Sequence, residues 1–131
     1  REKIRDMAER FEMTDALGDK ILSYSHGMRQ KIMVMGALLH DPSLWVLDEP
    51  LTGLDPKAAF ELKEMMREHA DSGRAVLFST LVLEVAEKLC DKVIIINKGH
   101  IVFQGTLAQL REGYAEGMSL EEIFLAVTEH A

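Results

Sequence analysis

The sequence has 131 residues, of which 47% are hydrophobic and 28% charged, the balance of a soluble globular domain. Because 15 basic residues stand against 22 acidic ones, the net charge of -7 argues against a broad surface for nucleic acid or anionic lipid. No apolar run approaches the roughly 18 residues of a membrane-spanning helix, and the charged amino-terminal stretch lacks a signal-peptide centre. We therefore expect a cytoplasmic protein, and Cys90, as the single cysteine, cannot form an internal disulfide.

Two helical patterns come first along the chain. The first is indicated by apolar residues at helical spacing within residues 1–12, namely Ile4, Met7, Ala8 and Phe11. The second runs from Gly27 to Leu39 and ends before Pro42, which disfavours helical geometry in the residue before it. Since the sequence opens inside a helical pattern without an initiator methionine, we expect it to be part of a longer protein.

The pattern then changes to strands separated by helices. The apolar run 44–47 predicts a strand buried on both faces, and Asp55 with Pro56 predicts the cap and first turn of a helix that extends to about residue 70. Its inward side is expected to hold Ala58, Leu62, Met65, Met66 and His69. Further strands are predicted at 75–79 and 92–97 with a helix over 81–90 between them, so we expect parallel neighbours with right-handed crossovers.

The carboxyl-terminal part predicts a hairpin and two capped helices. Residues 97–99 form a turn that leads from the strand at 92–97 into a second strand, "HIVFQG". Thr106 is the expected cap of a short helix, and Ser119 with Glu122 three residues later fits a capping box for the last one. The inward side of that last helix should hold Leu120, Ile123, Phe124 and Val127.

Asp48 and Glu49 directly follow the strand at 44–47. Open α/β sheets bind ligands outside the carboxyl ends of their strands, and hard carboxylate oxygens suit Mg²⁺, which substrate phosphates usually complete. Adjacent residues point to opposite faces, so one acid can hold a metal while the other orients a water. The alternative is that two acids merely end a strand at a solvated turn.

The order of the motifs carries a resemblance to a known family. "YSHGMRQKI", "LWVLDEPLTGLDP" and "AVLFST" followed by "LEVAEKLCDKVIIINKGHIVFQGT" resemble, in sequence and spacing, the latter part of the nucleotide-binding domain of ATP-binding-cassette (ABC) transporters. The signature variant and the ending "SLEEIFLAVTE" look like the subgroup that serves exporters and ABC-2-type permeases. The resemblance implies ATP and Mg²⁺ as cofactors.

The segment "YSHGM" matches the family's signature motif, which contacts the γ-phosphate of ATP held by the other subunit of a head-to-tail dimer. The matching residues are Tyr24, Ser25, His26, Gly27 and Met28. Ser25 can donate from its hydroxyl, Gly27 permits close backbone approach, and the helix start favours an anion. Two residues depart from the family's pattern: His26 is either an extra polar contact or a surface histidine, and Met28 cannot donate as the family's glutamine does.

The resemblance assigns roles to the acids. Asp48 matches the Walker B aspartate that holds Mg²⁺, and Glu49 matches the residue that polarises the attacking water. Asp55 matches the D-loop aspartate at the dimer interface, with a helix cap as its structural alternative. Leu81 stands where the family carries a histidine that contacts the γ-phosphate. A positioned hydrogen bond is typically worth about 10²-fold or more in rate, so we expect impaired hydrolysis, whether Leu81 is engineered, natural or a sequence error.

No stretch matches G-x-x-x-x-G-K-[ST], so we do not expect this chain to bind ATP alone. The resemblance implies an α/β fold, a partial P-loop NTPase (RecA-like) parallel sheet flanked by helices, with a carboxyl-terminal β-hairpin. Residues 1–40 are assigned to the family's helical subdomain and residues 41–131 to its ATPase core.

Three functions follow as alternatives. In the first, the chain is part of an ATPase subunit that pairs with a second ATP-binding subunit and with a transmembrane permease at the inner face of the membrane. In the second, it is part of a degenerate subunit that dimerises without turnover, as Leu81 suggests. The third is an ATPase of the DNA-repair or chromosome-structure type. The short signature-to-Walker-B spacing, the absence of heptads and the acidic balance argue against this third function, so we expect no nucleic-acid partner.

Overall fold

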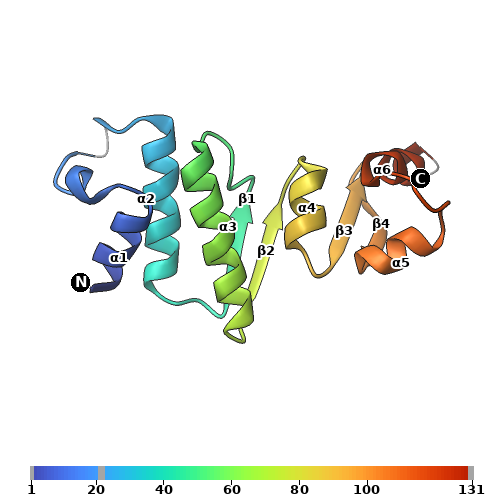
Figure 1. The fold of residues 1–131 in the computed structure, drawn as a ribbon, viewed down its shortest axis with the longest axis horizontal. Helices are drawn as coiled ribbons and strands as arrows, with labels where there is room; N and C mark the ends of the chain where they lie inside the picture. Colours follow the sequence, from blue (N-terminus) through green and yellow to red (C-terminus); the bar gives the residue numbers. More distant parts are fainter. Residues whose placement is uncertain (1, 21–22, 130–131) are drawn as a thin grey trace. The chain divides into compact units, whose positions relative to one another are not determined.

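The computed structural model describes residues 2–20 and 23–129, so the outermost positions of the two predicted domains, residues 1 and 130–131, lie outside the described residues. The chain divides into two compact units, Arg1–Ser79 and Thr80–Ala131 (Figure 1). This division reflects only how closely the residues of each unit pack with one another. It does not test the assignment of residues 1–40 to a helical subdomain, which stays a prediction. Among the described helices, none combines the length and the apolar character that crossing a membrane requires.

The first unit consists of helices and a two-stranded parallel sheet. In chain order its elements are α1 (Glu2–Arg10), η1 (Thr14–Ala16), α2 (His26–Leu39), β1 (Leu44–Asp48), α3 (Pro56–Asp71) and β2 (Ala75–Ser79). The two strands pair in parallel from Leu44 opposite Ala75 to Asp48 opposite Ser79, with α3 as the crossover between them. The predicted parallel pairing of these strands is therefore confirmed.

The core of the first unit is formed by buried side chains from α1, α2, β1 and α3. The Trp45 side chain of β1 is 1% exposed, and its ring meets the His69 ring of α3 edge to face at a centroid distance of 5.5 Å. The predicted inward side of α3 is buried throughout: Ala58, Leu62, Met65, Met66 and His69. Arg10 of α1 forms ion pairs with Glu61 and Glu68 of α3, at 2.9 and 2.8 Å.

The prediction that the strands are buried on both faces is wrong for this chain. Leu44 and Val46 of β1 are 52% and 62% exposed, and Leu77 of β2 is 51% exposed. Side chains alternate across a strand, so Trp45 faces α3 while its sequence neighbours point to the other side of the sheet. A continuous apolar run indicates that both faces favour burial, but it does not show which faces other segments cover.

The second unit contains a hairpin and three helices. Its elements are α4 (Leu83–Leu89), β3 (Val93–Asn97), β4 (His100–Gly105), α5 (Leu107–Glu112) and α6 (Leu120–Glu129). The strands pair antiparallel with an irregularity between Ile95 and Ile96, and the connecting residues Lys98 and Gly99 have φ of 51° and 79°, as a type I′ turn requires. The predicted hairpin is confirmed.

The strand predicted at 92–97 forms, as β3, and pairs with β4 within the second unit. Its parallel pairing with the strands of the first unit stays a prediction. A local apolar pattern identifies a strand, but pairing depends on which strand edges the tertiary structure brings together.

The core of the second unit is a cluster of four buried side chains, Ile95, Leu110, Leu120 and Ile123. Both predicted helix caps are confirmed. The Thr106 hydroxyl accepts from the Gln109 N–H at 3.1 Å at the start of α5. At the start of α6 the Ser119 hydroxyl accepts from the Glu122 N–H at 3.1 Å, and the Glu122 carboxylate accepts from the Ser119 N–H at 3.3 Å.

Candidate functional site

The first unit contains every predicted site residue except Leu81, which lies in the second unit. Within the first unit they fall on two segments, the approach to α2 at residues 24–28 and the connection from β1 to α3 at residues 48–55. We call these the α2 start and the 48–55 turn. Contacts between the two segments bring most of the predicted residues into one region of the surface.

The α2 start is a capped helix end at the protein surface. Ser25 is exposed, and its hydroxyl oxygen accepts from the Met28 N–H at 3.1 Å, while its own N–H points to the Met28 sulfur at 3.5 Å. The hydroxyl hydrogen of Ser25 remains able to donate, because a serine side chain both donates and accepts. Met28 thus takes part in a capping arrangement, in which its thioether is only a weak acceptor.

Tyr24 anchors the segment that leads into α2. It is 6% exposed, and its hydroxyl donates to the Ala16 carbonyl at 2.6 Å. This bond fixes the chain one residue before the cap. Tyr24 therefore positions Ser25 and His26, both of which are exposed.

Two glycines allow the α2 start to approach the 48–55 turn closely. A β carbon on Gly27 would lie 2.9 Å from the Gly53 carbonyl oxygen. A β carbon on Gly53, which has φ of 81°, would lie 2.3 Å from Cδ2 of the exposed His26 ring. The Gln30 side chain adds a hydrogen bond to the Pro50 carbonyl at 2.8 Å. Sequence reasoning missed Gln30 and Gly53, because contacts across 20 or so residues leave no local pattern.

The acid pair lies at the carboxyl end of β1 beside the end of β2. Asp48 is exposed and accepts from the Ser79 hydroxyl, and the Glu49 N–H donates to the Ser79 hydroxyl at 3.1 Å. Glu49 has φ of 45°, in the left-handed region that few residues other than glycine adopt. Ser79 was missed as a site residue. One sequence feature could have identified it: Ser79 is a polar residue at the end of the predicted strand 75–79, which was expected to lie beside the strand that precedes the two acids.

Asp55 caps α3. Its carboxylate accepts from the Ala58 N–H at 2.8 Å and lies 3.7 Å from the Lys31 ammonium of α2. The Ala58 N–H, and then the charge of Lys31, hold the pKa of Asp55 below its ordinary value. The predicted helix-cap role is confirmed, and the role at a dimer interface stays a prediction.

The donor set at the end of β1 fits a cation that is held mainly by water and phosphate. Among the described residues no group of three or more His, Cys, Asp or Glu side chains could hold a metal ion. Asp48 does supply one exposed carboxylate with a hydroxyl beside it, and Mg²⁺ in phosphate sites commonly takes only one or two protein carboxylates.

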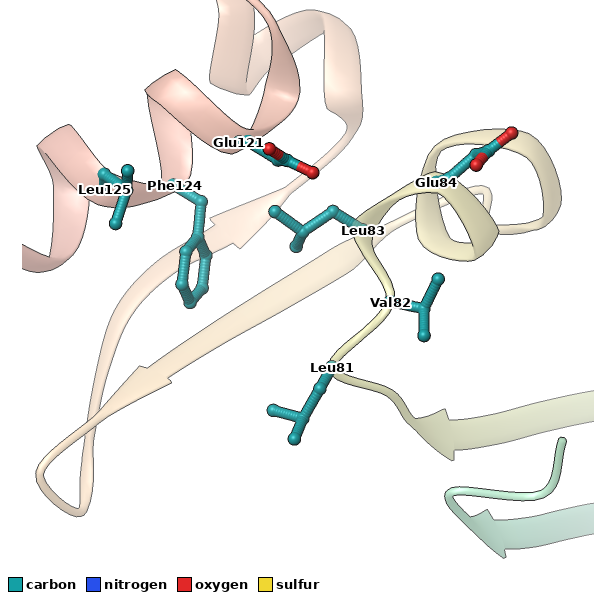
Figure 2. Close-up of a pocket in the computed structure, with 7 residues that line it drawn as sticks. All are labelled: Leu81, Val82, Leu83, Glu84, Glu121, Phe124 and Leu125. Atoms are coloured by element: carbon teal, nitrogen blue, oxygen red, sulfur yellow. The ribbon is translucent and has the colours of Figure 1, made fainter. Parts of the chain in front are cut away.

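Leu81 lies on the surface of the second unit and is 88% exposed. It borders an open hollow between residues 81–84, which lead into α4 and begin it, and one side of α6, shown in Figure 2. The hollow is lined by Leu81, Val82, Leu83, Glu84, Glu121, Phe124 and Leu125. Leu83 points toward α6, whereas Val82 and Glu84 point away from it (Figure 2). Leu81 offers neither a donor nor an acceptor to a ligand.

The chain is similar to ATP-binding proteins of transporters over most of its length. The family described as "ABC transporter" matches residues 1–52. EcsA of Bacillus subtilis, an ABC-type transporter ATP-binding protein, is 42% identical over 106 residues, which are 80% of this chain and 43% of EcsA. DrrA of Streptomyces peucetius, a daunorubicin/doxorubicin resistance ATP-binding protein, is 32% identical over 111 residues, 85% of this chain and 34% of DrrA.

A solved structure agrees with these relatives. The ATP-binding subunit of an ABC transporter superposes with a TM-score of 0.92 at 34% identity, covering 97% of this chain and 53% of that chain. This chain thus spans about half of that subunit and less than half of EcsA and DrrA. The chain belongs to the family of ABC transporter ATP-binding domains and forms part of one such domain.

Proposed function

We propose that this chain is the part of an ABC transporter ATPase subunit that carries the signature motif, Walker B and the D-loop. The complete subunit couples ATP hydrolysis to transport through a permease. The observation that carries this proposal is the contact between the α2 start and the 48–55 turn. It places a surface helix start beside the segment that carries both acids, within one compact unit.

The α2 start fits one phosphate group of a nucleotide. The first N–H groups of a helix have no intrahelical acceptor, and the helix dipole favours an anion at that end. Ser25 adds a hydroxyl hydrogen, and the side chains of Ser25 and His26 are exposed. We infer that this phosphate belongs to ATP bound by a second ATP-binding subunit in a head-to-tail pair.

Asp48 and Glu49 act on the ATP that is bound by their own subunit of that pair. Asp48 would hold Mg²⁺, largely through water, and the bound cation would supply positive charge to the phosphate oxygens. Glu49 accepts hydrogen bonds from the attacking water and orients it, a role that depends on position. Asp55 keeps the start of α3 in place, where it faces the partner subunit.

Glu49→Gln in the complete protein tests this proposal. We expect phosphate release to fall by about 10² to 10⁴-fold, because the amide cannot act as a base, while ATP-dependent dimerisation persists. Glu64→Gln is the matched control, since Glu64 is exposed on α3 away from the 48–55 turn, and it should leave phosphate release unchanged. Equal rates for the wild type and Glu49→Gln would contradict the proposed role.

A degenerate, non-hydrolysing subunit is the second candidate, and the exposed Leu81 favours it. Leu81→His in the complete protein distinguishes the two. If the proposed histidine position is right, phosphate release should rise by about 10²-fold, the size of one positioned hydrogen bond to developing charge. ATP-dependent dimerisation without phosphate release in the wild type would establish the degenerate function, and an unchanged rate in Leu81→His would contradict the placement of Leu81.

We infer that the complete subunit is peripheral, bound to a transmembrane permease at the cytoplasmic face of the membrane, and belongs to the exporter-like, ABC-2-type subgroup. The similarity to DrrA, a resistance protein, supports this subgroup. Fractionation tests the location: the subunit should sediment with membranes that contain its permease and should remain in the supernatant when the permease is deleted. Sedimentation without the permease would contradict this inference.

A further inference from the structure

Ser79, the last residue of β2, connects both members of the acid pair. It lies opposite Asp48 in the parallel register. Its hydroxyl donates to Oδ1 of Asp48 and accepts from the Glu49 N–H at 3.1 Å, which uses the hydroxyl once as a donor and once as an acceptor. The Ser79 carbonyl oxygen lies 3.2 Å from the same Glu49 N–H.

The backbone of Glu49 needs such support. Its φ of 45° is an uncommon conformation for a residue with a side chain, and such conformations persist only where neighbouring groups hold them. Ser79 presents two acceptors to the Glu49 N–H, one from the side chain and one from the backbone. Replacing the side chain by alanine would remove one acceptor and keep the other.

We propose that Ser79 is a positioning residue for the acid pair. By binding Oδ1 of Asp48 it fixes the rotation of that carboxylate and leaves Oδ2 for the waters of Mg²⁺. Through the Glu49 N–H it sets the direction in which the Glu49 side chain leaves the backbone. This inference rests on the proposed function, because it assigns Asp48 to the metal and Glu49 to the attacking water.

The test measures how much more tightly the complete protein binds ATP with Mg²⁺ than without it. Calorimetry gives the Kd for ATP with Mg²⁺ and with EDTA, in the wild type, Ser79→Ala and Ser79→Thr, and the ratio of the EDTA value to the Mg²⁺ value is compared. We expect Ser79→Ala to reduce the ratio of the two Kd values by about 10-fold, the usual effect of losing a hydrogen bond to a metal ligand. Ser79→Thr keeps the hydroxyl and should keep the ratio.

Controls separate positioning from folding. Ser23→Ala removes an exposed serine hydroxyl that donates to the Lys20 carbonyl in the same unit, and it should leave the ratio unchanged. Ser79→Cys preserves the side-chain size with a weak donor, so it serves if the alanine variant does not fold, and it should lower the ratio as well. With Asp48→Ala already present, Ser79→Ala should have no further effect on the ratio.

The outcomes distinguish this inference from the proposed function. A wild-type protein that binds ATP more tightly with Mg²⁺, together with Ser79→Ala and Ser79→Cys variants that keep the full advantage, would overturn the role of Ser79 and leave the proposed function intact. A complete wild-type protein that does not bind ATP would overturn both. A reduced ratio restored by threonine supports the inference.

Discussion

Four charged residues of the described chain adopt the left-handed backbone region, and two of them, Glu49 and Lys98, directly follow a strand. Glu49 follows β1 in the first unit with φ of 45°, and Lys98 lies in the β3–β4 hairpin of the second unit with φ of 51°. In the hairpin the conformation suits the twist of the flanking strands, and Gly99 completes a type I′ turn. After β1 no hairpin requires it, and hydrogen bonds to Ser79 hold it in place.

The comparison shows that the same dihedral angle has different reasons in the two turns. A lysine at position 98 is a weak choice for a turn that asparagine or glycine would stabilise better. A glutamate at position 49 is equally weak for the backbone, but it supplies a second carboxylate directly after Asp48 in the chain, at the end of the parallel sheet. Strain of this kind at a site is tolerated where function depends on the side chain.

The largest difference between the two turns is expected when Glu49 and Lys98 are replaced by glycine in two separate variants. In the complete protein, Glu49→Gly should lower phosphate release by about 10² to 10⁴-fold, because the variant loses the proposed base, whereas Lys98→Gly should leave it unchanged. Both variants relieve backbone strain, so neither should lower the free energy of unfolding. Comparable rates for the two variants, measured by phosphate release, would remove the functional reason for the strain at Glu49.

A second pair of substitutions compares glycines with nearly equal φ. Gly53 has φ of 81° with the His26 ring in the way of a β carbon, whereas Gly99 has φ of 79° with nothing within 4 Å. We expect Gly99→Ala to lower the free energy of unfolding by about 1 kcal/mol, from backbone strain alone. Gly53→Ala should lower it by about 3 kcal/mol, because steric overlap adds to the strain. Urea unfolding with localisation by amide exchange checks this, and equal losses would show that His26 simply moves aside.

Helix caps in the two units should differ in their response to pH. Because the pKa of Asp55 is lowered in the folded state, its stabilising contribution is fully present above its unfolded pKa and is lost as pH falls through the folded value, in the range below about pH 4. Asp55→Asn keeps a capping oxygen but should flatten the dependence of the unfolding midpoint on pH in that range.

The neutral cap of α5 is the control for this pH effect. Thr106→Ala should lower the stability of the second unit by about 1 kcal/mol at every pH, because a hydroxyl does not titrate there. A wild-type pH dependence that survives in Asp55→Asn would show that other carboxylates determine it.

The smallest expected effect comes from Lys98→Asn. Asparagine tolerates the left-handed region better than lysine and is preferred before glycine in a type I′ turn, so the free energy of unfolding should rise by about 0.5 kcal/mol. Amide exchange in β3 and β4 measures this gain. Faster exchange in the variant would mean that Lys98 stabilises the hairpin through its side chain.

Local patterns in the sequence were sufficient to predict the helices, the caps of α3, α5 and α6, and the hairpin. The apolar spacing of α3 predicted its buried side in full, and Asp55, Thr106 and Ser119 were identified as caps because a cap and its N–H partner lie only three residues apart. The acids at the end of β1 were found for a similar reason, since a strand and the polar residues that end it are adjacent in the chain.

Tertiary structure alone decided which distant groups meet. The Ser79 hydroxyl beside Asp48, the His26 ring against Gly53 and the Gln30 bond to Pro50 each join residues separated by 20 or more positions. The exposed faces of β1 and β2 were likewise invisible in their apolar runs. The physical reason is that side-chain periodicity records whether a residue favours burial, whereas its partners depend on how separate segments pack in space.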